Sequence, residues 1–166
     1  MFEATDVLVT EVIACLGEVA GRKKLQKMVF LLQSLGAPFE EKFCYHFYGP
    51  YSEQLADEVS WLVATGQVRE IPRETPSGYR EYVYQAESGG GAAGLGPRFR
   101  KLAQRLNDLD ARMLELMATI QYLCLQGMDG DQAGLRAREL KPAQAYAASE
   151  VEAAVVVLAE LRDEAA

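Results

Sequence analysis

Three segments in the first half of the chain carry apolar residues at the spacing of an amphipathic helix. The first runs from after Thr5 to about Ala20, the second from about Arg22 to Leu35, and the third from Ser52 to Gly66. Each is therefore predicted to be a helix with one buried face. The buried positions are predicted to be Val9, Val12, Ile13, Leu16 and Ala20, then Leu25, Met28, Val29 and Leu32, then Leu55, Val59, Leu62 and Val63.

Short aromatic and β-branched runs between and after these helices predict strands. The run Phe43–Tyr48 is aromatic and short, and Gln67–Ile71 and Tyr79–Gln85 flank a turn-rich segment, as in a β-hairpin. Helix, helix, strand, helix and hairpin in this order predict a winged-helix-like N-terminal domain with a small β-sheet over residues 1–87. The expected fold class is α+β, mostly α.

A glycine-rich segment at residues 88–97 predicts a flexible linker to a second unit. Residues 98–166 are predicted to form a C-terminal helical hairpin. Its first helix has apolar residues alternately four and three apart, the spacing of a heptad seam. We expect this seam to be a dimerisation element, the alternative being an intramolecular core. The seam residues are Leu102, Leu106, Leu109, Met113, Leu116, Ile120 and Leu123.

The formal net charge of −7 argues against nucleic acid as the default partner, because duplex affinity depends on neutralising phosphates. In a winged helix, the helix before the hairpin is the one expected in the major groove. Here that helix carries Glu53, Asp57 and Glu58 and no lysine or arginine, so DNA would repel it.

The rest of the composition is typical of a cytoplasmic globular protein. No apolar run reaches the roughly 18 residues of a membrane helix, and the start of the chain does not resemble a signal peptide. Cys15, Cys44 and Cys124 are odd in number and far apart, so we expect reduced thiols. No membrane association is expected.

Catalytic and metal-binding patterns are weak. The chain has one histidine, His46, which shares a predicted strand face with Cys44, and a thiolate–imidazole enzyme is the least favoured reading. Histidine and cysteine ligands are too few for a zinc site. The glycines of the predicted linker are not followed by the Lys-Ser or Lys-Thr of a phosphate loop. The sequence therefore predicts no catalytic residues, no metal and no cofactor.

Basic residues are concentrated at the start of the second predicted helix, as Arg22, Lys23, Lys24 and Lys27. Lys23 and Lys27 repel each other as i, i+4 neighbours, and this end of a helix disfavours cations. Such placement indicates an anionic partner, which could be DNA phosphate, an acidic protein face or the acidic helix of the same chain. The alternative is that these residues are structural or simply solvated.

Two short motifs resemble a known family: Lys24-Leu25-Gln26-Lys27-Met28-Val29-Phe30 and Tyr45-His46-Phe47-Tyr48-Gly49-Pro50-Tyr51-Ser52. Over roughly residues 8–85 the chain resembles the YwgA-type winged-helix proteins and, more distantly, the SocA-like antitoxin group of Panacea domains. This resemblance implies a small intracellular module without catalytic residues and, in the antitoxin branch, a toxin or a proteolytic adaptor as partner.

We therefore expect a non-enzymatic regulatory or adaptor module that associates with proteins, including itself as a homodimer. The alternative is a DNA-binding winged-helix regulator that contacts phosphates through Arg22–Lys27. The expected partner-binding residues are Arg22, Lys23, Lys24, Gln26, Lys27, Tyr48, Gly49, Pro50 and Tyr51.

Overall fold

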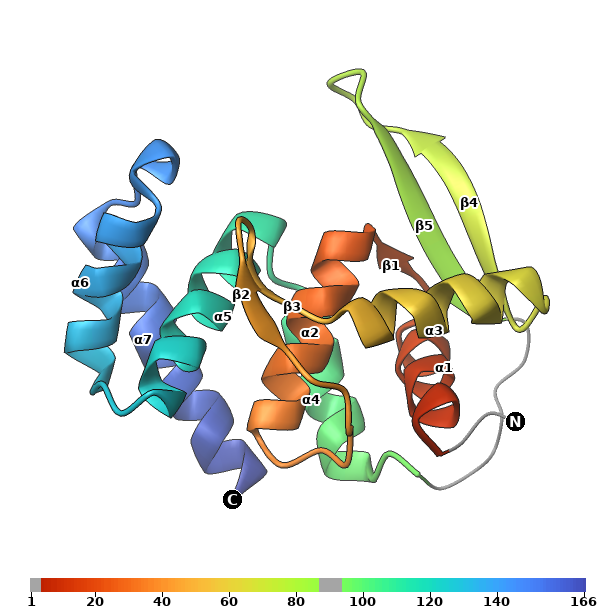
Figure 1. The fold of residues 1–166 in the computed structure, drawn as a ribbon, viewed down its shortest axis with the longest axis horizontal. Coiled ribbons are helices and arrows are strands. Elements are labelled where there is room, and N and C mark those ends of the chain that lie inside the picture. Colours follow the sequence, from red (N-terminus) through yellow and green to blue (C-terminus); the bar gives the residue numbers. More distant parts are fainter. Residues whose placement is uncertain (1–3, 87–93) are drawn as a thin grey trace.

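The computed structural model describes residues 4–86 and 94–166, which form a mostly helical α+β fold (Figure 1). The predicted fold class is confirmed at this level. In chain order the elements are α1 (Ala4–Leu16), β1 (Val19–Ala20), α2 (Arg22–Ser34), β2 (Cys44–His46), β3 (Gly49–Tyr51), α3 (Glu53–Ala64), β4 (Val68–Glu74), β5 (Arg80–Ala86), α4 (Pro97–Asn107), α5 (Ala111–Leu125), α6 (Gly130–Leu140), the 3₁₀ turn η1 (Pro142–Gln144) and α7 (Ala148–Ala165).

The predicted C-terminal β-hairpin of the first unit is present as β4 and β5. It forms an antiparallel sheet in the order β1-β5-β4, with Val19 opposite Tyr84 and Ile71 opposite Val83. The far end of the hairpin stands away from the helices (Figure 1). Its root, where Val83 and Tyr84 are buried, belongs to the core.

Two predicted elements near the N-terminus have different boundaries. The first helix was expected to reach Ala20, but it ends at Leu16, and Val19–Ala20 instead pair with β5. The predicted strand over 43–48 is a two-stranded hairpin, with β2 and β3 joined at Phe47 and Tyr48. Among the described strands, β3 pairs with β2 alone. The N–H that Pro50 lacks would therefore bond to no strand on the other side of β3, and proline is tolerated there.

The predicted heptad seam is wrong as one continuous helix. α4 ends at Asn107, and α5 begins after Asp110, whose carboxylate accepts a hydrogen bond from the Met113 N–H at 2.7 Å. The seam residues are thus divided between two helices. They pack within one chain, as the alternative of an intramolecular core predicts. Leu102, Leu106, Leu116, Ile120 and Leu123 are buried in the core, and Leu109 and Met113 pack partly buried against it.

One cluster of buried apolar side chains joins the N-terminal and C-terminal parts. It contains Val9 and Leu25 from the first part as well as Leu116 and Leu158 from the second. The division into 1–87 and 98–166 stays a prediction, and residues 88–93 of the predicted linker lie outside the described residues. The region 97–165 holds four α-helices, α4 to α7, where the pattern predicts two.

Candidate functional site

A buried hydrogen-bonded contact joins α2 to the segment that follows the β2–β3 turn. The Gln26 side chain donates from Nε2 to the Ser52 carbonyl at 2.8 Å and accepts at Oε1 from the Ser52 N–H at 2.9 Å. The Ser52 hydroxyl in turn accepts a hydrogen bond from the Leu55 N–H and caps α3, as its sequence position predicts. Gln26 therefore provides a hydrogen-bond partner for both the N–H and the carbonyl of the buried Ser52, as a neighbouring strand would.

Lys27 makes a second contact of the same kind. Its ammonium donates to the Pro50 carbonyl at 2.7 Å, and its side chain is nearly inaccessible to solvent. Burial lowers the Lys27 pKa, the negative charge of Glu115 opposes this, and the positive charges of Lys141 and Lys23 add to it, so that the pKa is about 8 in all. The Lys-Leu-Gln-Lys and Tyr-Gly-Pro-Tyr-Ser motifs therefore meet in the folded chain.

Gly49 allows this close approach. Its φ is 93°, and a Cβ atom there would lie 3.2 Å from Thr119 Oγ1 and 3.7 Å from Lys27 Cε. The sequence marks Gly49-Pro50 as a breaker between strand and helix. In the structure the pair is buried between α2 and α5, where the backbone conformation suits glycine best.

The other basic residues of α2 point in different directions. The Arg22 guanidinium forms an ion pair with Glu70 at 2.7 Å and donates to the Tyr84 hydroxyl at 2.6 Å, so it faces the β4–β5 hairpin. Lys24 donates to the Asn107 carbonyl at 2.6 Å, at the end of α4. The Lys23 ammonium lies 3.4 Å from the centre of the Tyr48 ring. The predicted basic cluster is thus not one uniform surface.

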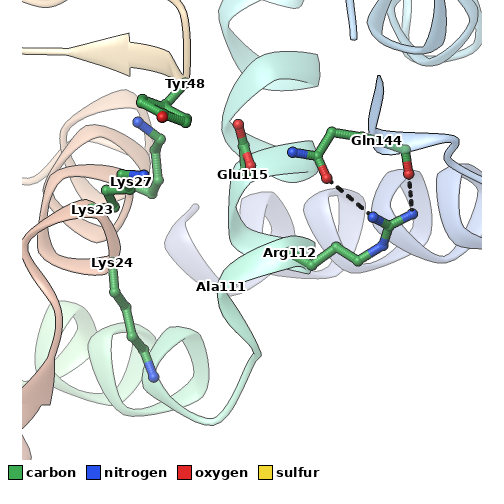
Figure 2. A pocket seen from close by; sticks show the side chains of 8 residues that line it. All are labelled: Lys23, Lys24, Lys27, Tyr48, Ala111, Arg112, Glu115 and Gln144. Atoms are coloured by element: carbon green, nitrogen blue, oxygen red, sulfur yellow. Dashed lines mark hydrogen bonds between the residues drawn. The ribbon is translucent and has the colours of Figure 1, made fainter. Parts of the chain in front are cut away.

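A cleft of about 240 Å³ separates α2 from α5 and η1 (Figure 2). Lysines line the α2 side, and Tyr48 closes one end (Figure 2). Four basic side chains and one acidic side chain face this volume. The lining residues are Lys23, Lys24, Lys27, Tyr48, Ala111, Arg112, Glu115 and Gln144.

The charged residues on the α5 side of the cleft already have partners. The Arg112 guanidinium forms an ion pair with Glu150 at 2.8 Å and donates to the Gln144 carbonyl at 2.7 Å. Glu115 accepts from the buried Lys141 ammonium at 2.7 Å. By contrast, Lys23, Lys24 and Lys27 form no ion pair within residues 7–86 and 94–166. The lysine side therefore carries positive charge without a direct ion pair, and the carboxylates of Asp108, Asp110 and Glu81 act on Lys24 only from a longer distance.

The sequence alone does not reveal the α5 side of this site. Arg112, Glu115, Lys141 and Gln144 belong to the second predicted unit, at least 85 positions after Lys27. None stands in a motif, and only the packing of α5 against α2 brings them to the cleft. Lys141 follows α6 directly, and only the structure shows that its side chain is buried.

The turn between β2 and β3 exposes two aromatic side chains next to the cleft. Phe47 is 86% exposed and Tyr48 47% exposed, and their rings pack edge to face with centroids 5.0 Å apart. Tyr51, the last residue of the predicted partner-binding set, stacks against His46 at 5.2 Å. The structure thus gathers Lys23, Lys27 and Tyr48 at the cleft, whereas Arg22 lies outside its lining.

The cysteines and the histidine of the chain lie outside the lining of the cleft. Cys44 and His46 are exposed on β2 and share no hydrogen bond in the described part of the chain, and all three cysteines are free thiols. No three histidine, cysteine or acidic side chains within this part gather as metal ligands would. None of its helices combines the length and apolarity needed to cross a membrane.

Comparison with known proteins places the chain in a family. No family model matches it. It is 34% identical over 151 residues to a Bacillus subtilis (strain 168) protein named "Uncharacterized protein YwgA", and the match covers 88% of this chain and 89% of that protein. The similarity therefore extends well past residue 85, where the resemblance of the motifs ended, and takes in helices that build the α5 side of the cleft. At this identity and coverage, the chain belongs to the YwgA family.

Proposed function

We propose that this protein is a non-enzymatic regulatory or adaptor module that binds a partner protein through the β2–β3 turn. The observation that carries the proposal is the 86% exposed side chain of Phe47 at the tip of a firmly anchored hairpin. Large aromatic side chains that protrude from a fixed backbone are typical anchors of protein interfaces. Tyr48 beside it adds apolar surface and a hydroxyl group.

Four hydrogen bonds hold the turn in place before any partner arrives. Lys141 donates to the Phe47 carbonyl at 3.1 Å, Lys27 to the Pro50 carbonyl, and Gln26 pairs with Ser52. A partner would therefore spend little free energy on ordering this backbone, and that favours affinity. The anchoring residues come from α2 and from the end of α6, so the turn is fixed from two sides.

The chemistry of the tip defines the partner. The Lys23 ammonium lies on the Tyr48 ring, next to Phe47 in the chain. A matching surface would offer an apolar pocket for Phe47 with a carboxylate at its rim for Lys23. A narrower form of the proposal names the partner as a toxin or a proteolytic adaptor and relates the chain to winged-helix and Panacea proteins. This narrower form rests on the motif resemblance.

The test is an affinity purification from the native cell with three versions of the full chain: wild type, Phe47→Ala and Tyr79→Ala. Tyr79 is the matched control, because it is an aromatic residue 75% exposed on the other hairpin. We expect the same protein with wild type and Tyr79→Ala, and roughly 30-fold weaker binding of the purified partner to Phe47→Ala, equivalent to about 2 kcal/mol. Equal capture by all three versions, or no specific capture by wild type, would overturn the proposal.

A further inference from the structure

We propose that the cleft between α2 and α5 is a binding site for a small anion, a ligand that carries a phosphate or carboxylate group (Figure 2). The site consists of Lys23, Lys24 and Lys27 on α2, facing Arg112 and Glu115 on α5. It shares Lys23 with the proposed partner surface, but it takes further ammonium groups from Lys24 and Lys27 and makes no use of the exposed Phe47 ring. The site therefore goes beyond the proposed function and does not depend on it.

Positive charge without a direct ion pair is the first observation. The protein has a net charge of −7, yet three lysines within five residues line this cleft without an ion-pair partner in the described part of the chain. Lys23 and Lys141 both act on Lys27 as like charges. An anion in the cleft would relieve this repulsion, and an anion in a partly desolvated site is attracted more strongly than at an open surface.

Unused hydrogen-bond donors are the second observation. Each lysine ammonium carries three N–H donors. Lys24 and Lys27 each give one hydrogen bond to a backbone carbonyl, and Lys23 has a ring face as its contact. Most of the donors at the cleft therefore remain available for the oxygens of a phosphate or carboxylate group.

The charged residues on the α5 wall are already paired with opposite charges, so they do not offset the positive charge of the lysines. Glu115 is held by Lys141, and Arg112 is held by Glu150 and Gln144. These pairs fix the α5 wall and leave the lysines without a carboxylate of their own. The cleft, with a volume of about 240 Å³, is large enough for a phosphate ester or a small dicarboxylate.

Isothermal titration calorimetry of the full chain tests this site with two probes, inorganic phosphate and citrate, at constant ionic strength. The cleft variant is Lys23→Gln/Lys24→Gln, which leaves the buried Lys27 in place. The matched control is Lys42→Gln/Lys101→Gln, which removes the same charge from two exposed positions outside the cleft. The probe that binds more tightly shows whether the site prefers a phosphate or a carboxylate group.

We expect saturable 1:1 binding of at least one probe to wild type, weakened tenfold or more in the cleft variant and less than twofold in the control. Absence of saturable binding to wild type, or equal weakening in both double variants, would overturn the site. A second measurement needs no variant: the bound anion should raise the Lys27 titration midpoint, followed by NMR at its Cε. Phe47→Ala should bind the anion normally, so failure of this site and failure of the partner proposal are separable.

Discussion

The side-chain amide of Gln26 on α2 forms two hydrogen bonds with the backbone of Ser52, one to the carbonyl at 2.8 Å and one from the N–H at 2.9 Å. Ser52 is fully buried and also caps α3. One side chain thus ties together α2, the β2–β3 hairpin and the start of α3. This position in the first family motif therefore has a structural task, which limits how freely it can serve a partner.

Replacing Gln26 by leucine should be strongly destabilising. Gln26→Leu leaves the buried Ser52 N–H without a partner, whereas the Ser52 carbonyl still accepts a hydrogen bond from the Ala56 N–H at 3.1 Å. We therefore expect a loss of about 1–3 kcal/mol in the free energy of unfolding. Urea denaturation followed by circular dichroism measures it. Gln104→Leu, on an exposed position of α4, should change stability by about 0.5 kcal/mol or less. A Gln26→Leu protein as stable as the control would contradict the role of this pair.

Gly49→Ala should cost more stability than Gly78→Ala. Both glycines have positive φ, 93° and 87°, so both substitutions strain the backbone. A Cβ at Gly78 meets nothing within 4 Å, whereas one at Gly49 lies 3.2 Å from Thr119 Oγ1. The extra crowding should add roughly 1 kcal/mol or more, visible as a lower thermal midpoint. Equal midpoints for the two variants would show that the hairpin relaxes away from α5.

Lys27 should titrate near pH 8, because burial lowers its pKa to about that value from the usual 10.5. Between these two pH values the unfolded chain holds a proton that the folded chain has released, so Lys27 makes stability rise with pH across this window. NMR titration of Lys27 Cε in the folded chain and in urea measures both midpoints. A folded midpoint above pH 10 would disprove the effect of burial.

Glu150 should make stability sensitive to acid. Hydrogen bonds from Arg112 and from the Ala147 N–H lower the Glu150 pKa to about 2 from its ordinary 4.5. Between these values the unfolded chain binds the proton and the folded chain does not, so stability falls as pH drops through this window. Glu150→Gln should flatten that fall in urea titrations at pH 5, 4 and 3. Glu152→Gln, an exposed neighbour on α7, should retain the wild-type slope, and identical slopes for all three proteins would contradict this assignment.

Duplex DNA should bind weakly or not at all at about 50 mM salt, a condition that favours phosphate contacts. Arg22 pairs with Glu70, Lys27 is buried, and Lys24 is held at the end of α4, so Lys23 is the one exposed cation of the cluster without a carboxylate or carbonyl partner among the described residues. Fluorescence anisotropy with a labelled duplex measures this. Binding that weakens steeply with salt and disappears in Lys23→Glu would favour the DNA-binding regulator instead.

Local pattern predicted much of the fold correctly because helices and hairpins depend on neighbours in sequence. The apolar stripe of α2, the Ser52 cap of α3 and the β4–β5 hairpin all follow from residues within a few positions of one another. The same reasoning failed at Leu102–Leu123, where the heptad spacing continues across a break. Spacing alone could not show that α4 ends at Asn107 and that the Asp110 side chain caps the next helix.

The candidate site shows the same limit of prediction from local sequence. The charged residues, the apolar helix faces and the resemblance of two motifs to the YwgA family can all be recognised without a structure. The three-dimensional fold is needed to show that Gln26 and Lys27 bind the backbone of Ser52 and Pro50, and that Arg112 and Glu115 complete the cleft. The physical reason is distance along the chain: these contacts join residues 23 to 94 positions apart, and packing of α2, α5 and the β2–β3 hairpin around one core creates them.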